Sequence, residues 1–440
     1  MKHNKPARYY DPDELRARLG ELDPVKIADE LARLEPSRQA EMFRQIEGDR
    51  AREVFCLLDA AHQETILGSL DETRAAALVE ELDPDDRARL FTELAKDHAE
   101  KLLAGLSPQE RRLTIQLLDY PAESAGRIMT PEYVSLQPDL TAAEALQQIR
   151  EQAAAAETIH TLPVIDSDER LVGMLELSDL VLAAPETPIR SIIREELRSV
   201  RADTDQETVA RLLQAADLLA VPVVDAGERL LGLVTVDDAM DVLTREEEED
   251  ISRAGGTEPL RRPYFSVSDL RLARSRIVWL LVLIVAATLT VQVLKTFEQT
   301  LDQVVALAMF IPLLIGTGGN AGAQSATTLV RGMAVGDVHP RDFLRTLLRE
   351  ARVGLLLGLM LGLLSYGPVW IFADPALALV VSLTLVSICT LASAVGALMP
   401  LLARSLGVDP AVASAPFVTT VVDATGLLVY FLIARAVLQL

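Results

Sequence analysis

The chain has 440 residues, too many for one compact core, and this length predicts two to four domains. Residues 1–270 carry 31 basic and 56 acidic residues, a balance of −25, whereas residues 271–440 carry 11 basic and 8 acidic residues. The mean hydropathy of +0.24 is therefore the average of an acidic soluble region and an apolar region. The negative charge of the acidic region repels phosphates, which disfavours nucleic-acid binding.

The cysteines and the start of the chain indicate a cytoplasmic location for the acidic region. Cys56 and Cys389 fall one in each region, so the chain has no disulfide framework. Residues 1–6 have no apolar stretch behind them, which argues against a signal peptide. Metal cations are the natural partners of clustered carboxylates in that compartment.

Residues 11–120 show a helical periodicity that restarts every dozen or so residues. The restarts are marked by Asp23-Pro24, Glu35-Pro36, Asp83-Pro84 and Ser107-Pro108. An Asp or Ser followed by Pro suits the N-cap and the first position of a helix. Short helices of this kind predict a right-angled superhelical stack, and we assign an all-α domain to residues 1–124.

Residues 125–245 contain a duplication. The segment 163–173 aligns without gaps to 222–232, and the same offset of 59 matches Asp179 to Asp238. Each copy is typical of a helix, an apolar strand, a polar turn, a second apolar strand and a helix. The pair resembles tandem CBS domains, which are small α/β modules, and we place them at residues 125–183 and 184–243.

The second copy has a Ser/Thr-x-x-Asp pattern at Thr235 and Asp238, which in CBS domains holds a nucleotide ribose. The first copy has Glu176 in place of the hydroxyl, so at most one nucleotide site, for ATP, is expected. An ordinary strand end is the alternative interpretation of the same residues.

A run of acidic residues leads from the second copy towards the apolar region. Residues 246–250 are five consecutive carboxylates, which repel one another along a helix. Such a run is usually a solvated patch, but this one leads directly into the first apolar run. We therefore predict an acidic connecting, or plug, helix over residues 244–270 that responds to neutralisation.

The apolar region, residues 271–440, contains five runs near or above the length of about 18–20 residues that spans a bilayer. They are Ile277–Leu294, Val304–Val330, Val353–Phe372, Leu377–Ala403 and Ala411–Ala434. Arginines gather before the first run and in the loop after the second, and Arg404 lies in the loop after the fourth. The positive-inside rule then predicts a multi-pass protein of the cell (inner) membrane, with its N-terminus cytoplasmic and its C-terminus outside.

Polar residues inside these runs point to an ion path. Asp423 lies in the middle of the last run, where a carboxylate costs about 2.5–3.5 kcal/mol by insertion scales. No Lys or Arg lies within the runs to pair with it, so a cation or a proton is the expected partner. A hydrogen bond to a neighbouring helix is the alternative. The four-residue spacing of Gly354, Gly358 and Gly362 puts them on one helix face and predicts only a packing seam with a neighbouring helix.

These features together resemble the MgtE family of magnesium channels and transporters. The resemblance is carried by residues 123–134 (ESAGRIMTPEYV), the CBS pair, residues 312–320 (PLLIGTGGN) and residues 416–426. It implies a homodimeric, multidomain membrane protein with an all-α N-terminal superhelix, an α/β tandem CBS pair and a five-helix α transmembrane domain. It also implies that Asp423 is the metal-binding carboxylate of a pore lined by Gly318, Gly319, Asn320, Ala415 and Asp423.

The resemblance further implies that cytosolic Mg²⁺ closes the pore by bridging acidic faces. The implied sensor ligands are Glu207, the Gln214 carbonyl, Asp217, Asp238, Asp241, Glu246, Glu249 and Asp250, with Asp85 and Glu64 in the helical domain. One position departs from the family pattern, because members often have Asn where this chain has Ala415. An oxygen that could face a hydrated ion is thus absent.

Three alternatives differ from a magnesium channel. An intramembrane metalloprotease would need a His-Glu-x-x-His helix, yet every histidine lies outside the apolar runs, so we expect no enzyme. A transporter of Co²⁺, Mn²⁺ or Ni²⁺ is the second alternative, because Ala415 departs from the family pattern in the pore. A non-transporting CBS membrane regulator is the third.

Overall fold

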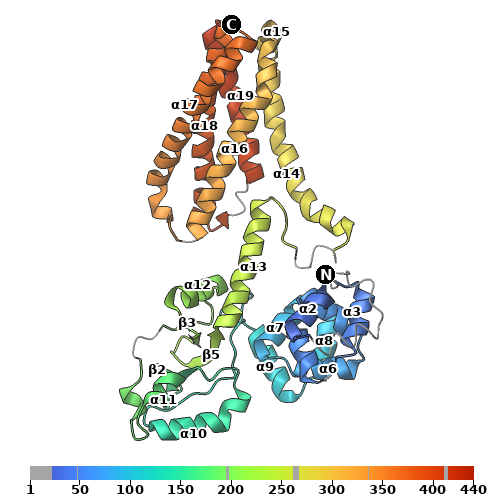
Figure 1. The fold of residues 1–440 in the computed structure, drawn as a ribbon, viewed down its shortest axis with the longest axis vertical. Helices are drawn as coiled ribbons and strands as arrows, with labels where there is room; N and C mark the ends of the chain where they lie inside the picture. Colours follow the sequence, from blue (N-terminus) through green and yellow to red (C-terminus); the bar gives the residue numbers. More distant parts are fainter. Residues whose placement is uncertain (1–21, 47, 195–197, 261–266, 335, 411–414) are drawn as a thin grey trace, which may run out of the picture. The chain divides into compact units, whose positions relative to one another are not determined.

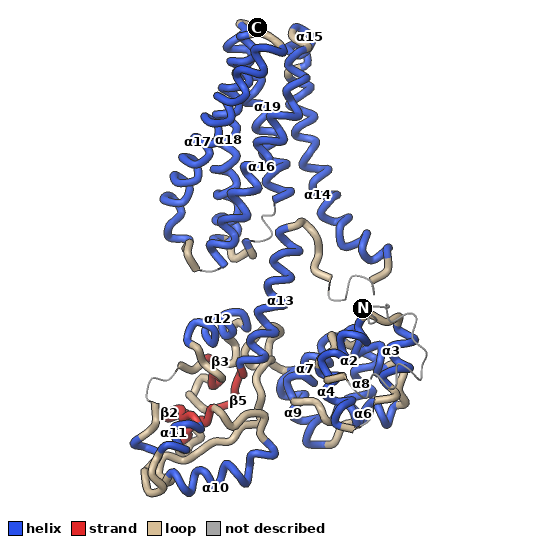
Figure 2. Tube along the Cα trace, viewed as in Figure 1, coloured by secondary structure: helices blue, strands red, loops and turns tan. Residues whose placement is uncertain are grey.

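The computed structural model describes residues 22–46, 48–194, 198–260, 267–334, 336–410 and 415–440. The predicted domain parts at 1–21 and 261–266, and the start of the fifth apolar run at 411–414, lie outside these residues. The described chain divides into two compact units, residues up to 246 and residues from 247 onwards. Figure 1 shows the fold and Figure 2 its helices and strands.

The first unit begins with a stack of short helices. They are α2 (Pro24–Ala32), α3 (Pro36–Phe43), α4 (Asp49–Cys56), α5 (Ala60–Leu67), α6 (Glu72–Glu80), α7 (Pro84–Glu93), α8 (Lys96–Gly105) and α9 (Pro108–Leu118). The four predicted Pro starts are confirmed, and the side chains of Asp23 and Ser107 accept hydrogen bonds from the backbone of the first turn. Helices two apart in sequence pack together, α2 on α4, α3 on α5, α6 on α8 and α7 on α9, which gives the superhelical stack.

The predicted duplication is visible in the strands. The first copy holds α10 (Ala142–Gln152), β1 (Thr161–Ile165), β2 (Leu171–Glu176) and α11 (Leu177–Leu182); the second holds β3 (Val200–Arg201), α12 (Gln206–Ala216), β4 (Ala220–Val224) and β5 (Leu230–Thr235). Short 3-10 turns lie at Ala153–Ala155 and Ile189–Ser191. The antiparallel registers Thr161↔Glu176 and Ala220↔Thr235 repeat at the offset of 59, and so do their bulges.

The connecting helix differs from the prediction. Helix α13 runs over Val236–Ala254, so it starts directly after β5 and ends well before residue 270. Gly255 and Gly256 follow it, and Gly256 has φ +68°, a conformation that glycine adopts without strain. The predicted helix over 244–270 is therefore wrong in its extent, because the acidic run is the second half of a CBS helix and a glycine pair stops it.

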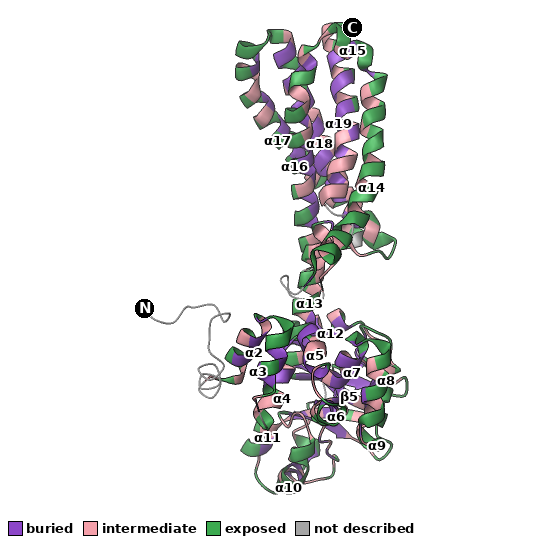
Figure 3. Ribbon diagram, turned by 90° about the vertical axis from the view of Figure 1, so that its right-hand side faces the viewer, coloured by how far each residue is buried: buried purple, intermediate pink, exposed green. Residues whose placement is uncertain are grey.

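The described residues of the second unit contain five helices that are long and apolar enough to span a membrane. They are α14 (Asp269–Thr296), α16 (Ala306–Ala334), α17 (Phe343–Phe372), α18 (Pro375–Ser405) and α19 (Ala415–Leu438), with the short α15 (Glu298–Gln303) and a 3-10 turn at Pro340–Asp342 between them. Helix α18 is the most enclosed, with α16, α17 and α19 packed on it. Figure 3 shows α14 as the most exposed of the five within one chain.

The predicted glycine seam is confirmed as a packing contact. Gly354, Gly358 and Gly362 of α17 are buried against α18. A Cβ on Gly358 would stand 2.5 Å from the Val386 Cα, and one on Gly354 would stand 2.4 Å from the Cys389 carbonyl oxygen. No side chain fits there, so the backbones of α17 and α18 touch directly.

Candidate metal sites

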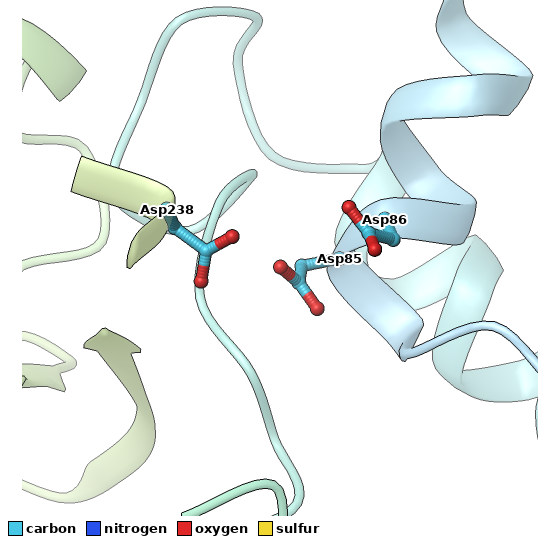
Figure 4. Close-up of side chains that lie close together, drawn as sticks. All are labelled: Asp85, Asp86 and Asp238. Atoms are coloured by element: carbon cyan, nitrogen blue, oxygen red, sulfur yellow. The ribbon is translucent and has the colours of Figure 1, made fainter. Parts of the chain in front are cut away.

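Three carboxylates of the first unit converge from two elements. Asp85 and Asp86 lie in the first turn of α7, and Asp238 lies in the first turn of α13. One oxygen from each side chain lies within 4.8 Å of one from each of the others. Figure 4 shows the carboxylates of Asp85 and Asp238 pointing towards one another across the space between the two helices. Such an oxygen cluster suits a hard divalent cation.

The inner part of this cluster lacks a neutralising partner. Asp85 is 6% exposed, and its Oδ1 has no hydrogen-bond partner among the described residues. Burial, followed by the charge of Asp238, raises the pKa of Asp85 well above its usual value. Burial also raises the pKa of Asp238 to about 6, against a hydrogen bond from Thr235. Buried like charges with an unpartnered oxygen are what a cation would relieve.

A fourth carboxylate approaches from the first CBS copy. Glu157 follows α10, and its Oε2 is buried with no hydrogen-bond partner in the described part of the chain. Burial raises the pKa of Glu157 to about 8, although a hydrogen bond with Thr130 opposes the shift and Asp238 and Asp83 add to it. Glu157 therefore belongs to the same electrostatic group as Asp85 and Asp238.

Two arginines of α7 hold its acidic turn in place. Arg87 is 1% exposed, lies 2.6 Å from the Glu110 carboxylate and donates to the Leu82 carbonyl at 2.8 Å, which fixes α7 against α9. Arg89 lies 2.6 Å from Asp86 and 3.2 Å from Asp241 of α13. Basic side chains thus contact Asp86 and Asp241, whereas none of the described ones forms an ion pair with Asp85 or Asp238.

The other predicted sensor residues of α12 and α5 lie apart from this cluster. Glu207 pairs with Arg211 one turn along α12, and Gln214 and Asp217 lie exposed at the end of that helix. Asp217 has φ 52° and forms the left-handed C-cap. Glu64 lies on α5, outside the three-carboxylate cluster. Among the described residues, the three-carboxylate cluster contains Asp85 and Asp238 of the predicted ligands and adds Asp86.

The remaining acidic residues of α13 contact other elements. Glu246 accepts a hydrogen bond of 2.8 Å from Gln206, which is buried at the start of α12. In the second unit, Arg253 at the end of α13 pairs with Glu249 and with Asp409 of the loop between α18 and α19. Asp250 lies half-buried beside them on α13. The end of α13 is thereby tied to the loop that leads towards α19.

The second unit contains one carboxylate deep in a predicted span. Asp423 lies near the middle of α19, and its Oδ1 is buried without a hydrogen-bond partner among the described residues. The alternative prediction, a hydrogen bond from Asp423 to a neighbouring helix, receives no support at this oxygen. An unpartnered carboxylate at this depth normally faces an ion or water path.

The predicted pore-lining residues occupy different surroundings. Gly318 and Gly319 are buried. A Cβ on Gly318 would stand 2.3 Å from an Ile388 methyl group, and a Cβ on Gly319 would stand 2.7 Å from a Thr419 methyl group. They allow α16 to approach α18 and α19 closely. Asn320 is exposed on the single chain, and Ala415 is half-buried at the start of α19. Their place on a pore wall stays a prediction.

Comparisons with known proteins bear on all three parts of the chain. A family model of divalent cation transporters, MgtE, matches residues 311–433, a model of the MgtE intracellular N domain matches 22–123, and the CBS domain matches 125–186 and 189–245. The chain is 44% identical to the magnesium transporter MgtE of Thermus thermophilus over 334 residues, which are 76% of this chain and 74% of that one. The chain belongs to the MgtE family.

Further MgtE proteins agree with this assignment. The magnesium transporter MgtE of Enterococcus faecalis is 39% identical over 72% of this chain and 70% of its own. A solved cytosolic domain of the Mg²⁺ channel MgtE in complex with ATP is 35% identical, with a TM-score of 0.50, over 53% of this chain and 95% of that one. As an MgtE protein with five candidate spans, the chain is a multi-pass membrane transporter and not an enzyme.

The predicted nucleotide site overlaps the three-carboxylate cluster at Asp238. Thr235 is buried at the end of β5, and its hydroxyl donates a short hydrogen bond to the Asp238 carboxylate. The predicted ribose site and the metal cluster would thus share Asp238. Nucleotide binding by this chain stays a prediction.

Sequence reasoning missed Asp86, Arg89, Glu157 and the Arg253–Asp409 pair. Asp86 could have been found, since it follows Asp85 directly after a helix-starting Asp83-Pro84. The others depend on contacts between distant segments, and no sequence spacing signals them.

The cluster predicts a pH dependence in the absence of divalent metal. Because the pKa of Glu157 is raised to about 8 and that of Asp238 to about 6, the folded form keeps protons that the unfolded chain has already released. The stability of the soluble region should therefore fall as the pH rises from about 6 to about 8. Thermal unfolding in EDTA at several pH values measures this, and Glu157→Gln should flatten the profile. A stability that rises over this range would contradict it.

Proposed function

We propose that this chain transports Mg²⁺ across the cell membrane through a pore in which Asp423 binds the ion. The observation that carries the proposal is the buried Asp423 oxygen, which has no hydrogen-bond partner among the described residues and lies near the middle of a candidate spanning helix of an MgtE-family chain. The named magnesium transporters at 44% and 39% identity support Mg²⁺ as the ion. The proposed orientation places the soluble unit in the cytoplasm and the C-terminus outside.

A carboxylate and few other ligands suit Mg²⁺ at such a site. Mg²⁺ sheds its water reluctantly and usually keeps several waters, so a wide site with one or two carboxylates is sufficient. In the proposed homodimer, two Asp423 side chains meet near the two-fold axis, and the divalent ion offsets their repulsion. Ala415 offers no side-chain oxygen to the hydrated ion, which makes Co²⁺, Mn²⁺ and Ni²⁺ the ions to compare.

We further propose that Mg²⁺ in the cytoplasm closes the pore by binding between Asp85, Asp86 and Asp238. Without a bound cation, burial and mutual repulsion disfavour the ionised form of Asp85 and Asp238. Binding would hold the helical stack against α13, and the Arg253–Asp409 pair would pass the change to the loop before α19. The ATP-bound cytosolic domain of a related Mg²⁺ channel supports nucleotide binding beside the cluster, with Thr235 and Asp238 as the residues to test.

Flux into liposomes that contain the purified protein tests the proposal. Uptake of Mg²⁺ into an indicator-loaded lumen is measured alone and against Co²⁺, Mn²⁺ and Ni²⁺. We expect Mg²⁺ uptake that the other ions reduce only in excess. Flux of the other ions in preference to Mg²⁺ would assign a broader transporter. Absence of flux for every ion, by correctly inserted protein, would favour a non-transporting regulator.

A further inference from the structure

Arg89 joins the helical stack to α13 without any metal. Its guanidinium lies 2.6 Å from Asp86 on its own helix and 3.2 Å from Asp241 on α13, which is 152 residues away in the chain. We propose that Arg89 is a built-in cation that takes the place of one divalent ion between α7 and α13. The proposal rests on the sensor site proposed above and assigns Asp241 to the guanidinium rather than to a metal.

The two helices face each other over two successive turns. On the first turn, Asp85 of α7 opposes Asp238 of α13, and both partners are acidic. One turn further along each helix, Arg89 opposes Asp241, and the partners have opposite charges. The first turn therefore needs an added cation to be neutral, whereas the second carries its own.

The charge of this second contact is permanent. Burial lowers the pKa of Arg89, but Asp86 and Asp241 outweigh the effect and raise it, and a guanidinium stays protonated at every physiological pH. Mg²⁺ at the first turn, in contrast, exchanges with the solution. The contact between Arg89 and Asp241 is therefore independent of Mg²⁺, whereas the contact between Asp85 and Asp238 depends on the Mg²⁺ concentration.

A second arginine disfavours a further metal ion at the outer contact. The Nε of Arg245 donates to the Asp241 carbonyl at 3.2 Å. Burial and then the charge of Arg89 lower the pKa of Arg245, so the two guanidinium groups repel each other. A divalent ion added beside Asp241 would meet both positive charges. One divalent ion, at Asp85, Asp86 and Asp238, is the stoichiometry that these charges favour.

The distance between the helical stack and the CBS pair tests the role of Arg89. Spin labels are attached at Lys101→Cys on α8 and Arg150→Cys on α10 in the full-length protein, with Cys56→Ser and Cys389→Ala, and pulsed electron resonance is recorded in EDTA and in Mg²⁺. We expect one distance of intermediate width in EDTA for the parent protein, which Mg²⁺ narrows as it binds at Asp85, Asp86 and Asp238. Arg89→Ala should broaden the distribution in EDTA beyond that of the parent and raise the Mg²⁺ concentration that narrows it by about three- to tenfold. Arg112→Ala, which removes an exposed arginine of α9, should change neither.

Charge reversal provides the sharper variant. Arg89→Asp adds a carboxylate opposite Asp241, so the distance should broaden in EDTA and return only at higher Mg²⁺, with a steeper concentration dependence because a second ion is then needed. If Arg89→Ala gives the same distance distribution in EDTA as the parent protein, the inference is wrong. If the parent protein ignores Mg²⁺ while Arg89→Ala still broadens the distance, the sensor proposal fails and the role of Arg89 stands.

Discussion

Asp423→Ala is expected to reduce divalent-cation flux to the level of empty liposomes while the protein stays folded. The Asp423 Oδ1 is buried in α19 without a hydrogen-bond partner among the described residues, so the substitution removes the proposed ion ligand and no observed hydrogen bond of that oxygen. A carboxylate at this depth costs about 2.5–3.5 kcal/mol by insertion scales, and its removal should leave thermal stability unchanged or higher. Flux and the unfolding temperature in detergent are measured on the same preparation.

Two further variants separate ligand loss from a general charge effect. Asp423→Asn keeps the size of the side chain and loses the charge, so it should also lose flux. Asp302→Asn removes an exposed carboxylate of α15 in the same unit and should transport normally. Wild-type Mg²⁺ uptake by Asp423→Ala would remove Asp423 from the ion path and with it the proposed pore site.

Much of the fold was predictable because its signals are local. Proline fits a helix without distortion only in its first turn, so it marks a helix start. The four helix starts predicted in this way, at Pro24, Pro36, Pro84 and Pro108, are all observed. The 59-residue offset predicted the same order of strand, turn and strand in the two CBS copies, and both copies form antiparallel strand pairs whose registers repeat at that offset. Apolar runs of bilayer length predicted the five long helices of the second unit.

The error in the connecting helix has a local cause too. The prediction separated the acidic run from the CBS helix at residue 244, although no Gly or Pro interrupts Val236–Ala254. The Gly255-Gly256 pair, which ends the helix, was available in the sequence. Like-charge repulsion along residues 246–250 did not break the helix, because contacts such as those of Glu246 with Gln206 and Glu249 with Arg253 compensate it.

The site was only partly predictable, because it is built between segments far apart in the chain. Asp85 and Asp238 were named from the family resemblance, and the structure brings them together. Glu157 and Arg89 carry no motif, and they matter only once α7 and the first CBS copy pack beside α13. Periodicity and spacing describe one element at a time, so charge neutralisation between elements is visible only in three dimensions.

Asp85→Asn combined with Asp238→Asn is expected to leave the pore active but to raise the Mg²⁺ concentration that half-closes it by at least about tenfold. The two amides keep the size of the side chains and remove the charges that hold the ion. Flux is measured with the cytosolic side of the liposomes at increasing Mg²⁺. Glu247→Gln combined with Glu248→Gln removes two exposed charges from the same helix and is the matched control, which should close as the parent does.

Stability in the presence of metal separates loss of the sensor from a loss of fold. An ion that binds only the folded form stabilises it by RT ln(1 + [L]/Kd), so the unfolding temperature of the parent soluble region should climb with Mg²⁺. The double variant should start at or above the parent in EDTA, because the repulsion between Asp85 and Asp238 is gone and Arg89 still pairs with Asp241. Its unfolding temperature should then stay flat as Mg²⁺ is added. If Mg²⁺ stabilises the double variant and closes its pore as in the parent, the three-carboxylate cluster is a structural contact and the Mg²⁺ sensor lies elsewhere, at α12 or at the end of α13.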